Sequence, residues 1–174
     1  MFQFNVEQTR CEQASISGTP AIISLDNNEE SINNLKLIKC DGNEFVCTVD
    51  YGGNVRMLWL NNLQREFIKF KNIYPSKNDN STWSLCGSAV NPPRVVVGSN
   101  AHMVTVFNLT NGAKSEIPAH NHNVPCVSFS PCGRFIASTS IDKSVKIWTE
   151  HPSGSGEYVL VKLSYPSRDW GWAV

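Results

Sequence analysis

Residues Ala119 to Thr149 read AHNHNVPCVSFSPCGRFIASTSIDKSVKIWT, a stretch with three short apolar runs separated by two turn sequences. The runs begin at Val124, Phe135 and Val145. The turn sequences are SPCG at 130–133 and IDK at 141–143. Short β-branched and aromatic runs bounded by Pro, Gly and Asp are typical of consecutive β-hairpins. We therefore expect three antiparallel strands within this stretch.

The spacing of this stretch recurs earlier in the chain. Phe107 stands 41 residues before Trp148, and Val104 stands 41 residues before Val145. Another unit precedes these, with a step of 49 residues from Leu58 to Phe107, which indicates a longer connecting loop. Recurrence at about 40 to 45 residues predicts a repeat architecture in which each repeat forms one small sheet.

The stretch resembles one WD40 repeat. It has AH where the repeat has Gly-His, SPCG where the repeat has Ser-Pro-Asp-Gly, and VKIWT where the repeat ends in VKIWD. The departures are Ala119, Cys132 and Thr149. The resemblance implies an all-β fold of the WD40-type β-propeller class. The propeller is expected to be partial, with about three complete four-stranded blades and incomplete blades at both ends.

The expected units follow one another along the chain. They are the outer strands of a preceding incomplete blade with a loop (1–30), three blades (31–75, 81–118 and 119–164) and the start of a further blade (168–174). Propellers close into rings of about four to eight blades, which removes exposed sheet edges. We therefore expect the chain to be a fragment of a longer propeller, and to self-associate through exposed apolar blade faces when it exists alone.

Polar residues of the opening stretch match the hydrogen-bonded tetrad of the WD40 repeat. The resemblance assigns to it His120, either Ser138 or Ser140, Asp142 and Trp148. The same residue types could form a Ser-His-Asp hydrolase triad. The structural tetrad is the favoured interpretation, because the chain has no G-x-S-x-G motif and the repeat accounts for the spacing. No catalytic residue is expected.

A second set of residues has types that zinc accepts as ligands. It is His120, His122, Cys126 and Cys132, spaced H-x-H-x3-C-x5-C. The repeat already assigns His120 to the tetrad and Cys126 to a strand. None of the six cysteines forms a C-x-x-C motif. We therefore expect no metal and no cofactor.

The composition excludes several function classes. Lys+Arg and Asp+Glu both number 15, so the formal net charge is zero and no basic footprint for direct nucleic-acid binding is evident. The amino terminus lacks the features of a signal peptide, and no apolar run reaches the roughly 18 residues that suggest a membrane span. We expect an intracellular soluble protein, in the nucleus or the cytoplasm, without membrane association.

The turns between second and third strands surround the channel mouth in WD40 propellers, and we expect other proteins to bind there. The side chains selected as candidates for peptide contact are Tyr51, Arg56, His102 and Lys143. Aromatic and cationic side chains dominate the energetics of many interfaces. The alternative interpretation of these four is that they are ordinary solvated turn residues.

A narrower resemblance extends over most of the chain, to the fungal WD40 proteins classed as ribonucleotide-reductase transcription regulators. The landmarks that carry it are Ile32–Leu35, Glu44–Val46, Ser81–Ser84, Val97–His102 and Arg168–Trp172. It implies a regulatory protein without catalytic activity. We expect a non-catalytic scaffold or regulatory module that binds proteins through the propeller rim and has a role in transcriptional regulation.

Two alternatives stay open at this point. The first is a substrate receptor of a ubiquitin ligase, whose W-D-x-R docking signature is not matched by the sequence WTEH at 148–151. The second is a propeller enzyme or metal-binding protein. It is disfavoured because no carboxylate pair, phosphate loop or nucleophile motif is present.

Overall fold

The structure is a computed structural model that describes residues 31–40, 42–60, 67–71, 81–88 and 90–164. The chain divides into two units, Met1–Ser31 and Ile32–Val174, and all described strands belong to the second unit. The incomplete blades expected at 1–30 and 168–174 lie outside the described residues. No helix in the described ranges has the length and apolarity of a membrane span.

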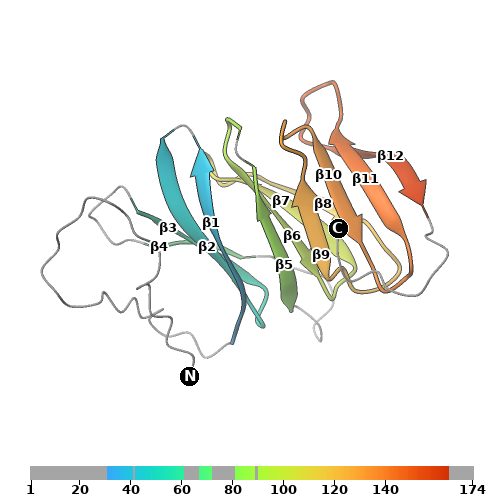
Figure 1. The fold of residues 1–174 in the computed structure, drawn as a ribbon, viewed down its shortest axis with the longest axis horizontal. Coiled ribbons are helices and arrows are strands. Elements are labelled where there is room, and N and C mark those ends of the chain that lie inside the picture. Colours follow the sequence, from blue (N-terminus) through green and yellow to red (C-terminus); the bar gives the residue numbers. More distant parts are fainter. Residues whose placement is uncertain (1–30, 41, 61–66, 72–80, 89, 165–174) are drawn as a thin grey trace, which may run out of the picture. The chain divides into compact units, whose positions relative to one another are not determined.

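The described residues form three antiparallel sheets of four strands each (Figure 1). The first sheet contains β1 (Ile32–Cys40), β2 (Asn43–Asp50), β3 (Asn54–Trp59) and β4 (Phe67–Lys71). The second contains β5 (Thr82–Gly87), β6 (Arg94–Ser99), β7 (Met103–Asn108) and β8 (Lys114–Pro118). The third contains β9 (Cys126–Phe129), β10 (Phe135–Thr139), β11 (Val145–Glu150) and β12 (Tyr158–Ser164). The prediction of an all-β fold is confirmed.

The pairing of strands repeats with the spacing of the sequence. Val95 on β6 pairs with Phe107 on β7, and Ile136 on β10 pairs with Trp148 on β11, so both members of the pair are displaced by 41 residues. Because side chains that pair across two strands point to the same face, the sequence repeat is also a repeat of position in space. Phe107 and Trp148 therefore occupy equivalent places in two successive sheets.

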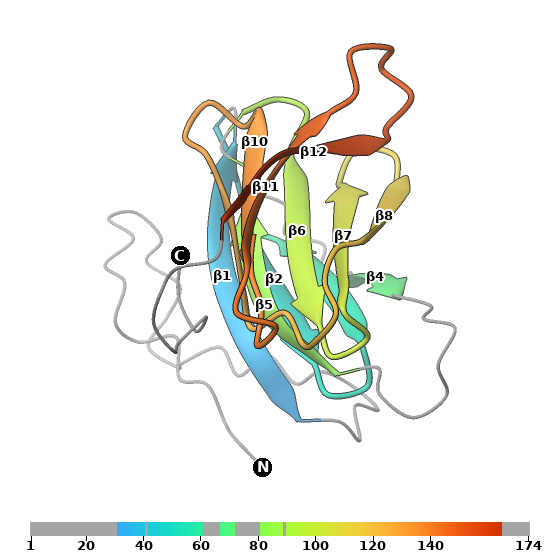
Figure 2. The same ribbon diagram turned by 90° about the vertical axis from the view of Figure 1, so that its right-hand side faces the viewer.

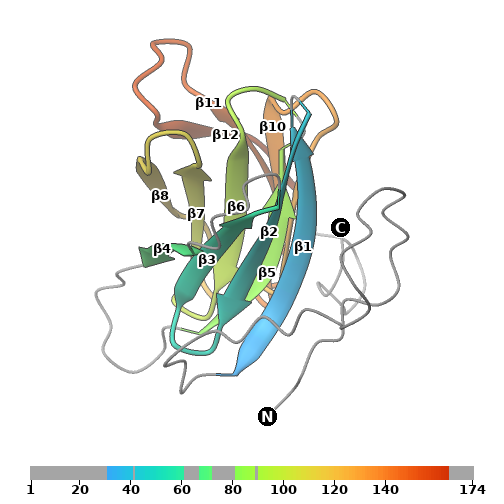
Figure 3. The same cartoon turned by 90° about the vertical axis from the view of Figure 1, so that its left-hand side faces the viewer.

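Each sheet packs face to face on the next. Strands β1, β5 and β9 form one edge of their sheets and contact one another in that order, while β4, β8 and β12 form the opposite edges. Figure 2 and Figure 3 show β1 and β5 on one side and β4 and β8 on the other. One buried core lies between the first and second sheets and includes Phe45, Met57 and Phe107. A second core lies between the second and third sheets and includes Ile136 and Trp148.

The middle sheet is buried on both faces, which explains the unbroken Val95-Val96-Val97 run of β6. Val95 and Val97 belong to the first core, and Val96 belongs to the second. Gly98 follows them, close to the backbone of Val124. A Cβ atom at Gly98 would lie 2.5 Å from the carbonyl oxygen of Val124, so this position admits only glycine without a backbone shift.

Candidate functional site

The turn between β10 and β11 positions the carboxylate of Asp142 for contact with His120. The amide of Lys143 donates to the carbonyl of Ser140 at 3.0 Å, and Lys143 has a positive φ of 68°. The amide of Ser144 donates to Asp142 Oδ1 at 2.9 Å. This side chain to backbone contact, two residues along, is the Asx-turn geometry that Asp favours. Contacts within its own turn therefore hold Asp142 in place, independently of its contact with His120.

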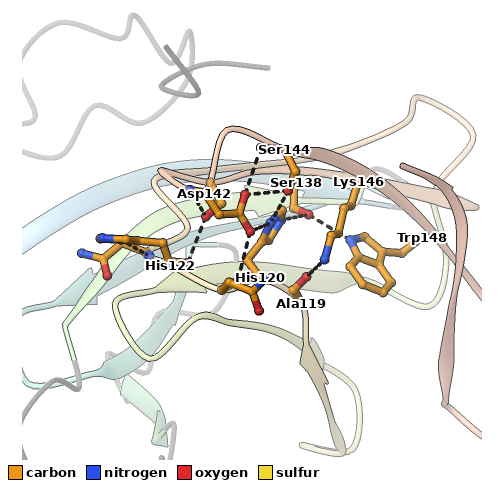
Figure 4. Close-up of polar contacts among 11 residues, drawn as sticks. Ala119, His120, His122, Ser138, Asp142, Ser144, Lys146 and Trp148 are labelled. Carbon is orange, nitrogen blue, oxygen red and sulfur yellow. Dashed lines mark hydrogen bonds and ion pairs between the residues drawn. The ribbon is translucent and has the colours of Figure 1, made fainter. Parts of the chain in front are cut away.

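Four side chains, from the segment before β9, from β10, from the β10–β11 turn and from β11, form one hydrogen-bonded chain (Figure 4). Trp148 Nε1 donates to Ser138 Oγ at 2.9 Å. Ser138 Oγ lies 2.8 Å from His120 Nε2, and His120 Nδ1 lies 3.0 Å from Asp142 Oδ2. An ionised carboxylate only accepts, so Nδ1 carries the imidazole proton and Nε2 accepts from the Ser138 hydroxyl. Every donor in the chain thus has an acceptor.

Two further serines lie next to this network, and only Ser144 belongs to it. Ser144 Oγ donates to Asp142 Oδ1 at 2.6 Å and lies 3.0 Å from His120 Nδ1, so it is a member that sequence reasoning missed. Its position two residues after an Asp in a turn was the available signal. Ser140 Oγ instead donates to the carbonyl of His122 at 3.0 Å. Of the two serines considered for contact with His120, the structure brings Ser138 to the ring.

The protonation states agree with this polarity. Burial lowers the pKa of His120 below its ordinary value of 6.5, although the hydrogen bond to Asp142 acts in the opposite direction. Burial acts to raise the pKa of Asp142, but hydrogen bonds from Ser144, the amide of Asn121 and His120 outweigh it and hold the pKa well below the usual range. The pair is therefore a neutral imidazole beside a carboxylate.

The connectivity Ser138–His120–Asp142 is that of a hydrolase triad, but its surroundings differ from those of a nucleophile. Ser138 is 0% exposed, and its Oγ already accepts a hydrogen bond from the Trp148 indole. A serine nucleophile must reach substrate and transfer its proton to the histidine at that moment. The geometry is suited to satisfying the buried indole and imidazole, whose unpaired burial would cost about 1–3 kcal/mol each.

The second sheet has apolar residues where the third sheet has this network. Forty-one residues before Ser138, Asp142 and Trp148 stand Val97, Ala101 and Phe107. Val97 and Phe107 are fully buried in the first core. Phenylalanine has no N–H to satisfy, so valine can replace the serine. A buried polar network is favourable only when all its members are paired. The third sheet has such a paired network, whereas the second sheet has apolar side chains at the equivalent positions.

Arg94 at the start of β6 connects the second sheet to the third. Its Nη2 donates to the carbonyl of Gly133 at 2.7 Å, and its Nη1 donates to Glu150 Oε2 at 3.2 Å and to Tyr158 Oη at 3.1 Å. The guanidinium also lies 5.5 Å from the centroid of the Phe129 ring, within the range of a cation–π contact. Phe129, Glu150 and Tyr158 lie on strands of the third sheet and Gly133 lies in its β9–β10 turn, so one side chain joins two sheets.

The four residues considered as zinc ligands occupy separate surroundings. His120 is engaged in the network, His122 lies on the exposed segment before β9, and Cys126 begins β9. Cys132 lies in the β9–β10 turn, where its Sγ is 3.2 Å from Ser130 Oγ. In the part of the chain that the structure describes, no group of three or more His, Cys, Asp or Glu residues could hold a metal ion.

Five segments lie at one end of the sheets and are here called the turn rim. They are residues 50–54, 81–83, 99–103, 119–124 and 140–144. Hydrogen bonds join them across sheet boundaries. Thr82 Oγ1 donates to the carbonyl of Asp50 at 2.8 Å, and the amide of His120 donates to the carbonyl of His102 at 3.1 Å. The rim is therefore a connected surface that spans all three sheets.

The side chains predicted to contact partners divide into two groups. Tyr51, His102 and Lys143 lie on the turn rim and are exposed. The choice of Arg56 as an exposed contact is wrong, because this residue is only 8% exposed and its Nη2 lies 3.5 Å from Asp50 Oδ2. Arg56 is therefore a buried ion-pair partner of Asp50 and not an exposed contact.

Three exposed side chains of the turn rim were not predicted as contacts. Trp83 is 46% exposed and Ile141 is 38% exposed. The imidazole of His122 lies beside that of His102, with ring centroids 5.8 Å apart. Trp83 lies on β5 between Thr82 and Ser84, whose side chains are both buried. Its exposure follows from its place near the beginning of β5, where the register with β6 shifts between Thr82 and Ser84.

Comparison with known families identifies the segment that contains the network. Residues 113–149 match the family model described as WD domain, G-beta repeat. Residues 113–149 are therefore similar to a WD40 repeat. The matched segment includes β8 to β11 and all members of the hydrogen-bonded chain from His120 to Trp148. The prediction of a WD40-type propeller fold, in partial form, is confirmed by this match and by the successive four-stranded sheets.

Similar proteins share the WD40 description. The chain is 36% identical over 156 residues to a WD40 repeat-containing protein of Dictyostelium discoideum, covering 84% of this chain and 22% of the relative. It is 30% identical over 142 residues to an uncharacterized WD repeat-containing protein of Schizosaccharomyces pombe, covering 71% of this chain and 28% of the relative. A shorter similarity, 30% over 71 residues, links it to the S. pombe protein hir1, covering 41% of this chain and 8% of the relative. The chain thus spans less than a third of the length of the curated relatives it matches.

Proposed function

We propose that the chain is a non-catalytic WD40 scaffold or regulatory module that binds other proteins through the turn rim. The observation that carries this proposal is the distribution of polar groups. The Ser138–His120–Asp142 set is buried and internally paired, whereas aromatic and cationic side chains of the rim are exposed to solvent. The network is architectural in this proposal, and it holds in place the turns that present the exposed side chains.

The regulatory part of the proposal rests on the resemblance to the fungal ribonucleotide-reductase transcription regulators. That resemblance supports a role in transcriptional regulation and a location in the nucleus or the cytoplasm. The relatives described above carry WD40 or WD-repeat names and support only the propeller part of the proposal.

The alternative of a ubiquitin-ligase substrate receptor is not favoured by any contact in the described chain. Thr149 and Glu150 stand where the docking signature would follow Trp148. Thr149 Oγ1 donates to the carbonyl of Arg134 at 3.1 Å, and Glu150 pairs with Arg94. Both side chains therefore support the packing of the third sheet.

The proposal is tested by affinity purification of the tagged full-length protein, with co-purifying proteins quantified by mass spectrometry. The rim variant replaces the two exposed aromatics, Tyr51→Ser and Trp83→Ser. A control variant replaces exposed residues away from the rim, His151→Ala and Lys162→Ala. We expect the rim variant to lose specific co-purifying proteins that the control retains. Retention of the same proteins by the rim variant, at unchanged stability, would contradict the proposal.

Exposed apolar side chains also support self-association of residues 1–174 expressed alone. They are Leu35 and Leu37 on β1 and Val159, Leu160, Val161 and Leu163 on β12. We propose that contacts through these strands produce oligomers whose size rises with concentration. Size-exclusion chromatography with light scattering measures this directly. A monomer at all concentrations would contradict it.

A further inference from the structure

Two imidazoles from neighbouring sheets meet on the turn rim. His102 lies in the β6–β7 turn of the second sheet and His122 lies in the segment that precedes β9 of the third. Their ring centroids are 5.8 Å apart and their planes are inclined by 32°. Both residues are exposed. Two rings that can donate hydrogen bonds are thus presented side by side.

The backbone around the two rings is fixed by hydrogen bonds rather than by the rings themselves. The carbonyl of His102 accepts from the amide of His120 at 3.1 Å. The carbonyl of His122 accepts from Ser140 Oγ at 3.0 Å, and the amide of Ile141 donates to the carbonyl of Asn123 at 3.1 Å. Three rim segments are therefore held together before any ligand binds, which lowers the entropic cost of binding.

The local hydrogen bond of His122 determines where its proton lies. The amide of Asn123 donates to His122 Nδ1 at 2.8 Å, so Nδ1 is an acceptor. A neutral imidazole then carries its proton on Nε2, which becomes a donor. A protonated Nε2 has no lone pair for a metal ion. The matching ligand is therefore a hydrogen-bond acceptor such as a carboxylate.

The charges of the rim agree with an anionic ligand. Asp50 and Asp142 are the acidic residues of the five rim segments, and both carboxylates are turned inward to protein partners. Lys143 extends from the β10–β11 turn and is exposed. Within the five described rim segments, the exposed ionisable side chains are thus cationic or neutral hydrogen-bond donors.

We propose that His102, His122 and Lys143 form a binding surface for an acidic peptide segment of a partner protein. The Nε2–H of His122 and the His102 ring would hydrogen-bond side-chain carboxylates, and the Lys143 ammonium would add electrostatic attraction. This inference rests on the proposed function and specifies the chemistry of its partner. Nucleic acid is a poorer match, because its binding rests mainly on cationic contacts to many phosphates and the chain has a formal net charge of zero.

The test measures fluorescence anisotropy of labelled peptides with the full-length protein. One peptide alternates Glu and Gly, and its matched peptide has Gln at every Glu. We expect the Glu peptide to bind at least about tenfold more tightly, with an affinity that falls as salt increases. A peptide with phosphoserine at the Glu positions and a DNA duplex serve as competing probes. Selective binding of either one, without binding of the Glu peptide, overturns the proposal.

Variants locate the surface. His102→Asn and Lys143→Asn keep a residue that tolerates the observed positive φ values of 64° and 68°, and His122→Ala removes the second ring. Each is expected to weaken Glu-peptide binding about two- to fivefold, and the triple variant more than about tenfold. His151→Ala and Lys162→Ala are the matched controls, and urea unfolding checks that each variant remains folded.

The outcomes separate this inference from the proposed function. Unchanged binding by a folded triple variant overturns the acidic-peptide surface, as does equal binding of the Glu and Gln peptides. If either result is obtained but the Tyr51→Ser, Trp83→Ser variant still loses co-purifying proteins, the turn rim binds partners that are not acidic peptides. If those aromatic variants also lose nothing, both proposals are wrong.

Discussion

Trp148 Nε1 donates to Ser138 Oγ at 2.9 Å, although both side chains are buried between two sheets. In the register of β10 and β11, Trp148 pairs with Ile136 and Ser138 pairs with Lys146, so the contact is diagonal across the two strands. The hydroxyl accepts from the indole and donates to the imidazole of His120. Among the described residues, only the Ser138 hydroxyl connects the Trp148 indole N–H to His120 and, through His120, to Asp142 in the β10–β11 turn.

Ser138→Val tests this link by introducing the residue that the second sheet has at Val97. The substitution replaces the hydroxyl by methyl groups, with one more heavy atom in a fully buried position, and it leaves the indole N–H and the imidazole Nε2 without partners. We expect it to lower the free energy of unfolding by about 1–3 kcal/mol for each orphaned group. Urea unfolding at neutral pH measures the change.

A double-mutant cycle provides the control for that measurement. Adding Trp148→Phe to Ser138→Val removes one orphaned donor, so we expect the double variant to be more stable than the sum of the two single effects predicts. Ser128→Ala, at a half-buried hydroxyl that bonds only the adjacent carbonyl of Phe129, should change stability by less than about 0.5 kcal/mol. Additive effects in the cycle would contradict the link.

The pH dependence of stability follows from the lowered pKa of His120. Below the ordinary value of 6.5 the unfolded chain binds a proton that the folded state does not, so stability is complete above that pH and declines as the pH falls below it. The depressed pKa of Asp142 adds a second loss below its ordinary value of 3.8, in the same direction. Urea unfolding from pH 8 to pH 4 should show the first decline. A His120→Gln variant should show a smaller decline between pH 6.5 and pH 5 than the unaltered protein.

Arg94→Met tests the connection between the second and third sheets. It removes hydrogen bonds to Gly133, Glu150 and Tyr158, and we expect a loss of about 2–3 kcal/mol in unfolding free energy. Arg94→Lys should recover less than half of this loss, since an ammonium cannot reproduce the planar fork of donors. Arg134→Met, at an exposed arginine over the Phe135 ring, is the control and should have a smaller effect. Full recovery by lysine would show that charge alone accounts for the contact.

Cysteine reactivity should differ strongly between two described thiols. Hydrogen bonds from Ser130 and Arg134 lower the pKa of the exposed Cys132 to about 7, whereas burial raises the pKa of Cys47 to about 12. We expect iodoacetamide to modify Cys132 first, with a rate that rises through about pH 7 as thiolate forms. Peptide mapping by mass spectrometry identifies the site, and a Cys132→Ser variant provides the blank. Equal labelling of Cys47 in the folded protein would contradict the assignment.

Local pattern was sufficient for much of the fold and for part of the site. Strand-length apolar runs bounded by turn residues predicted the all-β class, because period-two burial and turn chemistry are properties of short segments. The 41-residue recurrence placed Phe107 and Trp148 in equivalent positions. His120, Ser138, Asp142 and Trp148 could be selected together because the repeat keeps their spacing in sequence.

Other features depended on contacts between segments far apart in the chain. Whether Ser138 or Ser140 contacts His120, and the burial of Arg56, follow from how strands pair and which face each side chain takes. Arg94 joins two sheets, and His102 lies beside His122, because successive sheets pack face to face. Periodicity in sequence specifies the face of a strand within its own sheet, but not which neighbouring sheet covers that face. The amino-acid sequence therefore determined the blade-like sheets and their internal bracing, whereas packing between sheets determined which groups remain on the rim for a partner.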